Sequence, residues 1–118
     1  QCTRRKGDGI FLFRDIGIFQ LLVALSGQEQ TLEFIESQIG RLIAYDRQKG
    51  TKLLHTLEEI LQGPNLKQVA DKMYLHHKTM VFCKQRIETI LGRSIDLFEV
   101  RIALAAAIKL YKLNFVLK

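Results

Sequence analysis

Hydrogen-bond donors of several kinds gather in one short segment of the chain, between Asn65 and Gly92. They are the side chains of Lys67, Gln68, His76, His77, Lys78, Thr79, Lys84, Gln85 and Arg86. Cationic, imidazole, amide and hydroxyl groups are those with which proteins contact the phosphates and base edges of DNA. Presented together on one face, these groups predict a surface that enters a major groove.

The apolar residues of the same segment predict two helices joined by a tight turn. Val69, Ala70 and Met73 fall on one face of a short first helix, and Leu75 lies in the connection. On the second helix, apolar residues recur at three- and four-residue steps, which is the helical period, at Met80, Cys83, Ile87 and Ile90 with Leu91. The pattern indicates a helix-turn-helix motif with a recognition helix at about 77–91.

The ends of the motif carry residues with strong positional preferences. Gly63-Pro64 stops the preceding helix, because proline cannot continue one. Asn65 is the expected N-cap of the first helix, with Gln68 as its capping-box partner. Gly92 is expected to end the second helix.

Positive charge is concentrated in this motif. The chain has 118 residues and a formal net charge of +6. Residues 65–93 hold six cations against two carboxylates, and residues 1–14 hold four cations against one carboxylate. Basic charge alone fits nucleic acid, a membrane surface or an acidic protein equally well.

The remaining sequence predicts an all-α, multi-helix domain. Residues 1–9 are expected to be a flexible linker or the tail of an upstream region, and 9–13 could form a short strand. Residues 10–62 are expected to form a helical supporting region, and residues 63–118 to hold the motif and a long C-terminal helix.

Four helices are expected outside the motif, each with an apolar stripe. They are predicted from Asp15 to about Leu25, from Thr31 to a break near Gly40 with further turns beyond, from Gly50-Thr51 to Gly63, and over 97–113. Asp96 and Glu99 are the expected capping pair of the last helix. This helix is apolar nearly all round, which predicts burial within the domain or at a dimer interface.

Each polar position of the motif also has a structural interpretation. His76 and His77 could cap the second helix, and Thr79 could bond to its own helix backbone. Lys78, Lys84 and Gln85 could form no more than a solvated face. Arg86 could pair with an acid, either Glu88 or Asp96.

The sequence predicts neither catalysis nor a metal site. His55 lies one helical turn from Glu58 and Glu59, but no nucleophile, phosphate loop or oxyanion feature accompanies them. His76 and Cys83 are seven residues apart, about 10 Å along a helix, which is too far for one ion to hold both. No cofactor is expected.

Cysteine usage favours a reducing compartment, and we expect a cytoplasmic protein. Cys2 and Cys83 have no paired spacing, so they predict neither a zinc ribbon nor a disulfide framework. Cys83 is expected to be a small, buried apolar residue. No signal peptide is visible, and the longest apolar stretches are too short to span a bilayer.

The chain resembles the DNA-binding domain at the C-terminal end of the PucR/CdaR family of bacterial transcriptional regulators. The resemblance covers about residues 10–114 and rests on FRDIGIFQLL at 13–22, IGRLIAYDRQKGTKLLHTLEEIL at 39–61 and NLKQVADKMYLHHKTMVFCKQRIETILG at 65–92. The second helix of the motif also looks like that of Fis-type helix-turn-helix proteins.

The chain departs from the family pattern at several positions. Many family members have arginine at the positions of Val81 and Cys83 and an apolar residue at that of Lys84, so contacts to DNA are not expected from 81 or 83. Tyr74 occupies a turn position that is glycine in many helix-turn-helix proteins.

The resemblance implies double-stranded DNA as the partner and an effector sensed by a region absent from this chain. A homodimer on a two-fold site is expected because helix-turn-helix modules usually bind paired half-sites. An alternative, motivated by the apolar helix at 97–113, is a helical protein-interaction or oligomerisation domain that does not read DNA. The two functions could coexist. A basic face centred on residues 77–84 would favour DNA binding.

Overall fold

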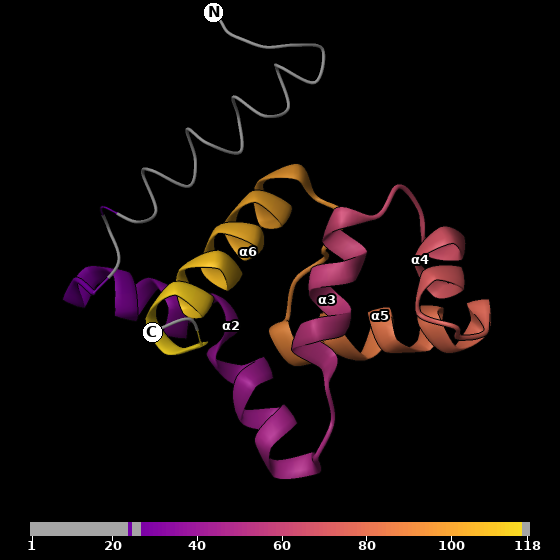
Figure 1. The fold of residues 1–118 in the computed structure, drawn as a ribbon, viewed down its shortest axis with the longest axis horizontal. Coiled ribbons are helices and arrows are strands. Elements are labelled where there is room, and N and C mark those ends of the chain that lie inside the picture. The colour runs from indigo at the N-terminus through magenta and orange to yellow at the C-terminus, as the bar shows by residue number, and fades with distance from the viewer. Residues whose placement is uncertain (1–23, 25–26, 117–118) are drawn as a thin grey trace, which may run out of the picture.

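The computed structural model describes Ala24 and residues 27–116, and this part of the chain is all-α, as predicted (Figure 1). Its elements are α2 (Glu29–Lys49), α3 (Leu53–Gln62), α4 (Leu66–Lys72), α5 (His77–Leu91), α6 (Phe98–Tyr111) and the π-helical turn η1 (Lys112–Val116). The described residues contain no β-strand. The flexible linker, the possible strand at 9–13 and the helix expected from Asp15 to Leu25 lie outside this description.

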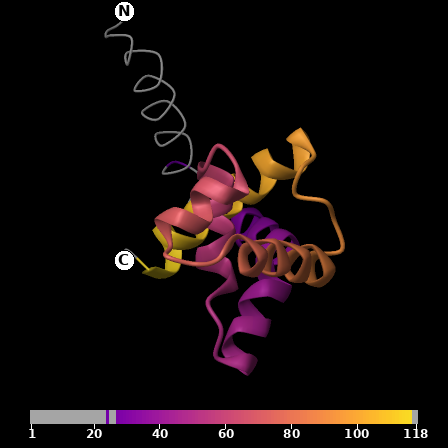
Figure 2. The ribbon, with the colours of Figure 1, turned by 90° about the vertical axis from the view of Figure 1, so that its right-hand side faces the viewer.

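One hydrophobic core holds α2, α3, α5 and α6 together. Its fully buried large side chains come from every one of these helices and from the α5–α6 loop: Ile39, Leu42, Leu57, Met80, Ile87, Ile95 and Leu104. Helix α2 contacts α3, α5 and α6, and α3 crosses α5 (Figures 1 and 2). Helix α4 packs against the N-terminal part of α5, so the core fixes the position of the predicted recognition helix.

Helix α2 runs without interruption through Gly40, and the predicted break near this residue is wrong. Gly40 is itself buried, and Ile35, Ile39 and Leu42 continue one buried face on both sides of it. A mid-helix glycine costs roughly 0.5–1 kcal/mol, which burial of these side chains outweighs. The helix ends instead at Gly50, whose φ of 69° is left-handed.

Helix α3 begins at Leu53 rather than at Gly50-Thr51, because its N-terminal cap comes from the preceding helix. The carboxylate of Asp46 accepts hydrogen bonds from the backbone N–H groups of Leu53 (2.8 Å) and Leu54 (2.9 Å). It also accepts one from the hydroxyl of Thr51 at 2.6 Å. A carboxylate at a helix N-terminus satisfies open donors and favours the helix dipole.

The expected capping role of Asp96 is also wrong. Helix α6 starts at Phe98, one residue later than predicted, and no side chain caps it. The α-helix ends at Tyr111, and the chain continues in the π-helical turn. Arg101 ties α6 to the rest of the domain, since its guanidinium donates to the carbonyl oxygens of Ile60, Leu61 and Ile95.

Candidate nucleic-acid interface

Helices α4 and α5 form the predicted helix-turn-helix. Asn65 caps α4 as expected, with its Oδ1 accepting from the backbone N–H of Gln68 at 2.9 Å. Val69 and Ala70 are buried against the core. Gly92 ends α5 with a φ of 72°, as expected. The first and last residues of the motif are therefore where the sequence placed them.

Tyr74 adopts a left-handed backbone conformation in the turn between α4 and α5, with a φ of 59°. It is the non-glycine residue with positive φ in the described part of the chain, and its side chain is 95% exposed. The turn is closed by backbone hydrogen bonds from Tyr74 to Asp71 and from Leu75 to Ala70. The left-handed conformation that glycine adopts readily is thus held here by a residue with a side chain, for which it is sterically disfavoured.

His76 is the N-cap of α5. Its Nδ1 accepts a hydrogen bond from the backbone N–H of Lys78 at 3.0 Å. Because Nδ1 acts as an acceptor, the neutral ring carries its proton on Nε2. His76 can therefore cap the helix and still offer an Nε2–H donor to a phosphate. The capping interpretation and the contact interpretation of this residue are compatible.

The solvent-facing side of α5 presents Lys78, Phe82, Gln85 and Thr89, which are all exposed and follow each other at three- and four-residue steps. Residues at this spacing share one helix face. His77 and Thr79 are also exposed in the first turn, and Lys67 and Gln68 are exposed on α4. Phe82, which is 56% exposed, was not among the predicted site residues. The helical period places residue 82 opposite Met80 and Ile87, and this spacing could have indicated from the sequence that Phe82 is exposed.

Lys84 lies on the flank of α5 rather than on its outward face. Its side chain is only 19% exposed, and its Nζ lies 2.8 Å from Oδ2 of Asp96. The ion pair therefore fastens α5 to the loop that leads into α6. Lys84 was predicted as a DNA contact, and the structure gives it a protein partner instead of a free ammonium group.

Arg86 is exposed but held by two aromatic side chains. Its Nη1 donates to the phenolic oxygen of Tyr45 at 2.6 Å, and its guanidinium carbon lies 5.1 Å from the ring centroid of Phe82. Neither acid proposed as its partner is used: Asp96 pairs with Lys84, and Glu88 accepts from the backbone N–H of Ile95.

The cations of the motif differ in whether they already contact another protein group. Four of the six between residues 65 and 93 contact protein groups: Lys72 with Glu59, Lys84 with Asp96, Arg86 with Tyr45, and Arg93 with Gln38. Within the described residues, Lys67 and Lys78 have no ion-pair partner. These two are the cations that can approach a phosphate or a base without breaking an existing contact.

The carboxyl group of Glu59 lies close to two basic side chains. Its Oε1 lies 2.8 Å from Nζ of Lys72, and its Oε2 lies 3.8 Å from Nε2 of His55. The hydrogen bond from Lys72 lowers the pKa of Glu59 below its ordinary value, against the opposing effect of burial. The pair with Lys72 ties α3 to α4, whereas His55 and Glu59 lie one turn apart on α3 itself.

Cys83 is half-buried and packs against the edge of the core, so the expectation of a buried apolar residue is met only in part. It occupies the flank of α5 beside the apolar seam made by Met80 and Ile87, which are fully buried. The orientation of α5 about its own axis places residue 83 beside the row of buried side chains rather than within it.

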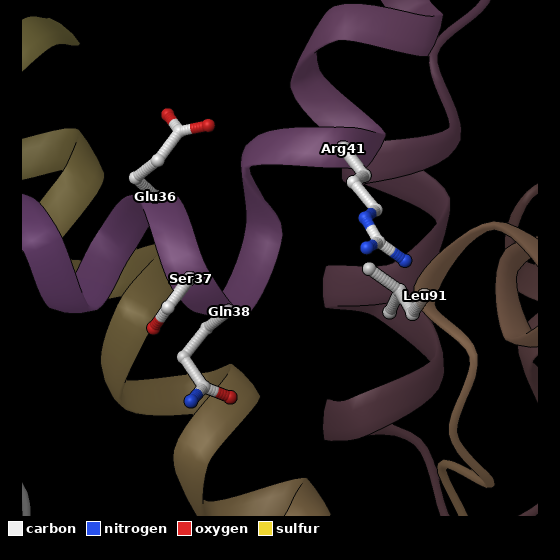
Figure 3. A pocket seen from close by; sticks show the side chains of 5 residues that line it. All are labelled: Glu36, Ser37, Gln38, Arg41 and Leu91. Carbon is white, nitrogen blue, oxygen red and sulfur yellow. The ribbon is translucent and has the colours of Figure 1, made fainter.

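An open hollow lies between α2 and the C-terminal end of α5, lined by Glu36, Ser37, Gln38, Arg41 and Leu91. In Figure 3 the guanidinium of Arg41 extends toward Leu91, whereas Glu36 points away. The hydroxyl of Ser37 donates to the carbonyl oxygen of Phe34. The lining therefore brings together no pair of groups suited to nucleophilic catalysis.

The described residues offer neither a metal site nor a membrane span. No group of three or more histidine, cysteine, aspartate or glutamate side chains lies close enough there to hold a metal ion. None of the helices in that part of the chain has the length and apolar character needed to cross a membrane.

Comparison with known proteins adds to this geometry. Residues 53–110 match the family model of the PucR C-terminal helix-turn-helix domain. The chain is also similar to the proline-responsive transcriptional activator PutR of Bacillus subtilis (strain 168), with 28% identity over 90 residues. The match covers 75% of this chain and 21% of PutR, so the chain spans about a fifth of that relative's length. No solved structure matches the chain.

Proposed function

Because residues 53–110 belong to the PucR C-terminal helix-turn-helix family, we propose that the chain is the sequence-specific DNA-binding module of a bacterial transcriptional regulator. The observation that carries the proposal is the outward face of α5. It is exposed, lacks a carboxylate at positions 78, 82, 85 and 89, and begins at a well-formed cap. A helix of this kind suits insertion into the major groove.

The residues divide into two roles according to their exposure and their existing contacts. His77, Lys78 and Gln85 face outward and are the candidates for base contacts. Phosphate contacts fall to residues around them, on α4 and at the start of α5: Lys67, Gln68, His76 and Thr79. Each good bidentate base contact is worth roughly 1–3 kcal/mol of discrimination.

Lys84 and Arg86 take a supporting role in this proposal. Their side chains already contact Asp96 and Tyr45, which lie outside α5. A contact with DNA would have to replace these interactions or share them. We therefore assign both residues to holding α5 in place, in revision of the role that the sequence predicted for them.

The proposal is tested by selecting bound sequences from a random duplex pool and measuring affinity for the selected site. Lys78→Ala should weaken binding by about tenfold or more, with an unchanged circular dichroism spectrum. Lys109→Ala is the matched control, because Lys109 is an exposed lysine on α6. If no sequence is enriched, or if both variants bind as the wild type does, DNA reading by α5 is wrong.

A second function, self-association, is favoured by exposed apolar residues at the start of α6. Leu97, Phe98 and Ile102 are all more than half exposed, and Phe98 is 71% exposed. A homodimer would place two α5 helices on a two-fold site, with half-sites about one helical turn apart. Sedimentation of the chain alone and with a two-half-site duplex tests this. A monomer in both states that binds one half-site tightly would exclude the dimer.

The longer protein is proposed to sense an effector through a region outside these residues. The name of PutR describes an activator that responds to proline, and the aligned part is a small share of that protein. By analogy, the present chain would supply DNA binding inside the cell and leave sensing to another region.

A further inference from the structure

Phe82 is an exposed aromatic ring on an otherwise polar helix face. It is 56% exposed, and its neighbours along the outward stripe of α5 are Lys78, Gln85 and Thr89. Exposure of a large apolar side chain to water is unfavourable, and contact with a partner would remove this cost. Met80 and Ile87, on the opposite face of α5, are fully buried. Phe82 is therefore available to a partner and unnecessary to the core.

The ring of Phe82 is held in a defined position by Arg86. The guanidinium carbon lies 5.1 Å from the ring centroid, within the range of a cation–π contact. Arg86 is itself fixed by the hydrogen bond to the phenolic oxygen of Tyr45, at 2.6 Å. A side chain that is restrained before binding loses less entropy when a ligand contacts it.

The base edges that line the major groove carry one kind of apolar group. Thymine carries a C5-methyl group there, whereas the other bases present donors and acceptors. Phenylalanine has no hydrogen-bonding group, so among base edges the thymine methyl is the one to which its ring is matched. Lys78 and Gln85, one turn to either side, can bond to adjacent base edges.

We propose that Phe82 is a specificity-determining residue that packs against the methyl group of a thymine in the bound DNA. This inference rests on the proposed insertion of α5 into the major groove. It adds a preference that the hydrogen-bonding residues cannot supply, because a thymine methyl offers them no partner. A selected binding site should therefore contain a thymine in each half-site whose methyl group contributes to affinity.

The test uses the selected duplex with each thymine replaced in turn by deoxyuridine, which lacks only the methyl group. For the wild-type chain, one position per half-site should lose affinity by about three- to tenfold. Phe82→Ala should bind the unmodified duplex more weakly and show no further loss at that position. Phe82→Leu, which keeps an apolar side chain, should retain part of the discrimination. Phe115→Ala is the matched control, since Phe115 is a 60% exposed phenylalanine in η1, outside the helix-turn-helix.

The outcomes separate the two proposals. If the wild-type chain binds the selected duplex but no thymine replacement matters, or if Phe82→Ala shows the same penalty as the wild type, thymine reading by Phe82 is overturned while DNA binding stands. If the wild-type chain enriches no sequence, the proposed function and this inference both fail. Thermal unfolding of each variant confirms that the domain is folded during the measurement.

Discussion

The guanidinium of Arg86 and the phenolic oxygen of Tyr45, 41 positions apart in the sequence, are joined by a hydrogen bond of 2.6 Å. The bond connects the outward side of α5 to the C-terminal part of α2. Arg93, two residues beyond the end of α5, makes a second connection to α2, donating to the side-chain oxygen of Gln38 at 2.8 Å and to its backbone carbonyl oxygen. The orientation of α5 is therefore set by α2 at two places, one within the helix and one just beyond its end.

Tyr45→Phe should lower the free energy of unfolding by about 0.5–1.5 kcal/mol, because it removes the acceptor for Arg86 and leaves the aromatic ring in place. Urea denaturation measures the change. Tyr111→Phe is the control, since its hydroxyl makes no hydrogen bond within the described part of the chain. Equal losses in the two variants would mean that the Arg86–Tyr45 bond contributes nothing to stability.

Lys67 and Lys84 should differ in how they affect the salt dependence of DNA binding. Lys67→Ala should weaken binding to all sequences and reduce the slope of log affinity against log salt by about 0.9, the value for one phosphate contact. Lys84→Met should leave this slope unchanged and lower stability by about 0.2–1 kcal/mol, because it breaks the pair with Asp96. A reduced slope for Lys84→Met would mean that Lys84 contacts a phosphate of the DNA after all.

The Glu59–Lys72 pair should make stability depend on pH in the acid range. The pKa of Glu59 is lowered below its ordinary value of 4.5, chiefly by the hydrogen bond from Lys72. A lowered folded-state pKa gives stability that is present above about pH 4.5 and is lost as the pH falls through the folded value. Glu59→Gln should thus be less stable than the wild type at pH 7, and the difference should shrink below pH 4.5. A difference that stays constant from pH 7 to pH 3 would contradict this assignment.

Tyr74→Gly should stabilise the turn between α4 and α5. A φ of 59° destabilises an L-residue by about 1–2 kcal/mol, and glycine removes this strain. About half of the gain is lost, because glycine has more conformational entropy to lose on folding. A net gain of roughly 0.5–1 kcal/mol is expected in thermal or urea unfolding. Gly92→Ala provides the opposite case, since φ is 72° there, and should destabilise. If Tyr74→Gly is less stable than the wild type, contacts of the tyrosine ring outweigh the backbone strain.

The helix-turn-helix could be predicted because its signals are local. Asn65 and Gly92 act within four residues of their own positions, and the apolar spacing of α5 follows directly from the helical period. Family resemblance located the same motif. These signals depend little on what the rest of the chain does.

The errors arose where a distant group decided the outcome. Asp46 caps α3 from another helix, so the start of α3 was placed too early. Gly40 is carried through α2 by burial that depends on tertiary packing. The partners of Lys84 and Arg86 also lie on other elements, Asp96 in the α5–α6 loop and Tyr45 on α2, so the pairs that they form could not be identified from local spacing. Phe82 was not among the predicted site residues, because that set consisted of side chains that form hydrogen bonds and phenylalanine forms none.

Asp46 also has a consequence for the order in which the domain folds. It closes the α2–α3 corner through groups five, seven and eight residues further along the chain. Bonds between such near neighbours close small loops and can form early in refolding. The packing of α6 on α2 joins segments far apart in sequence and closes a much longer loop. We expect the corner to form first and the docking of α6 to be the slow step, so that the support for α5 is completed only when α6 packs on α2.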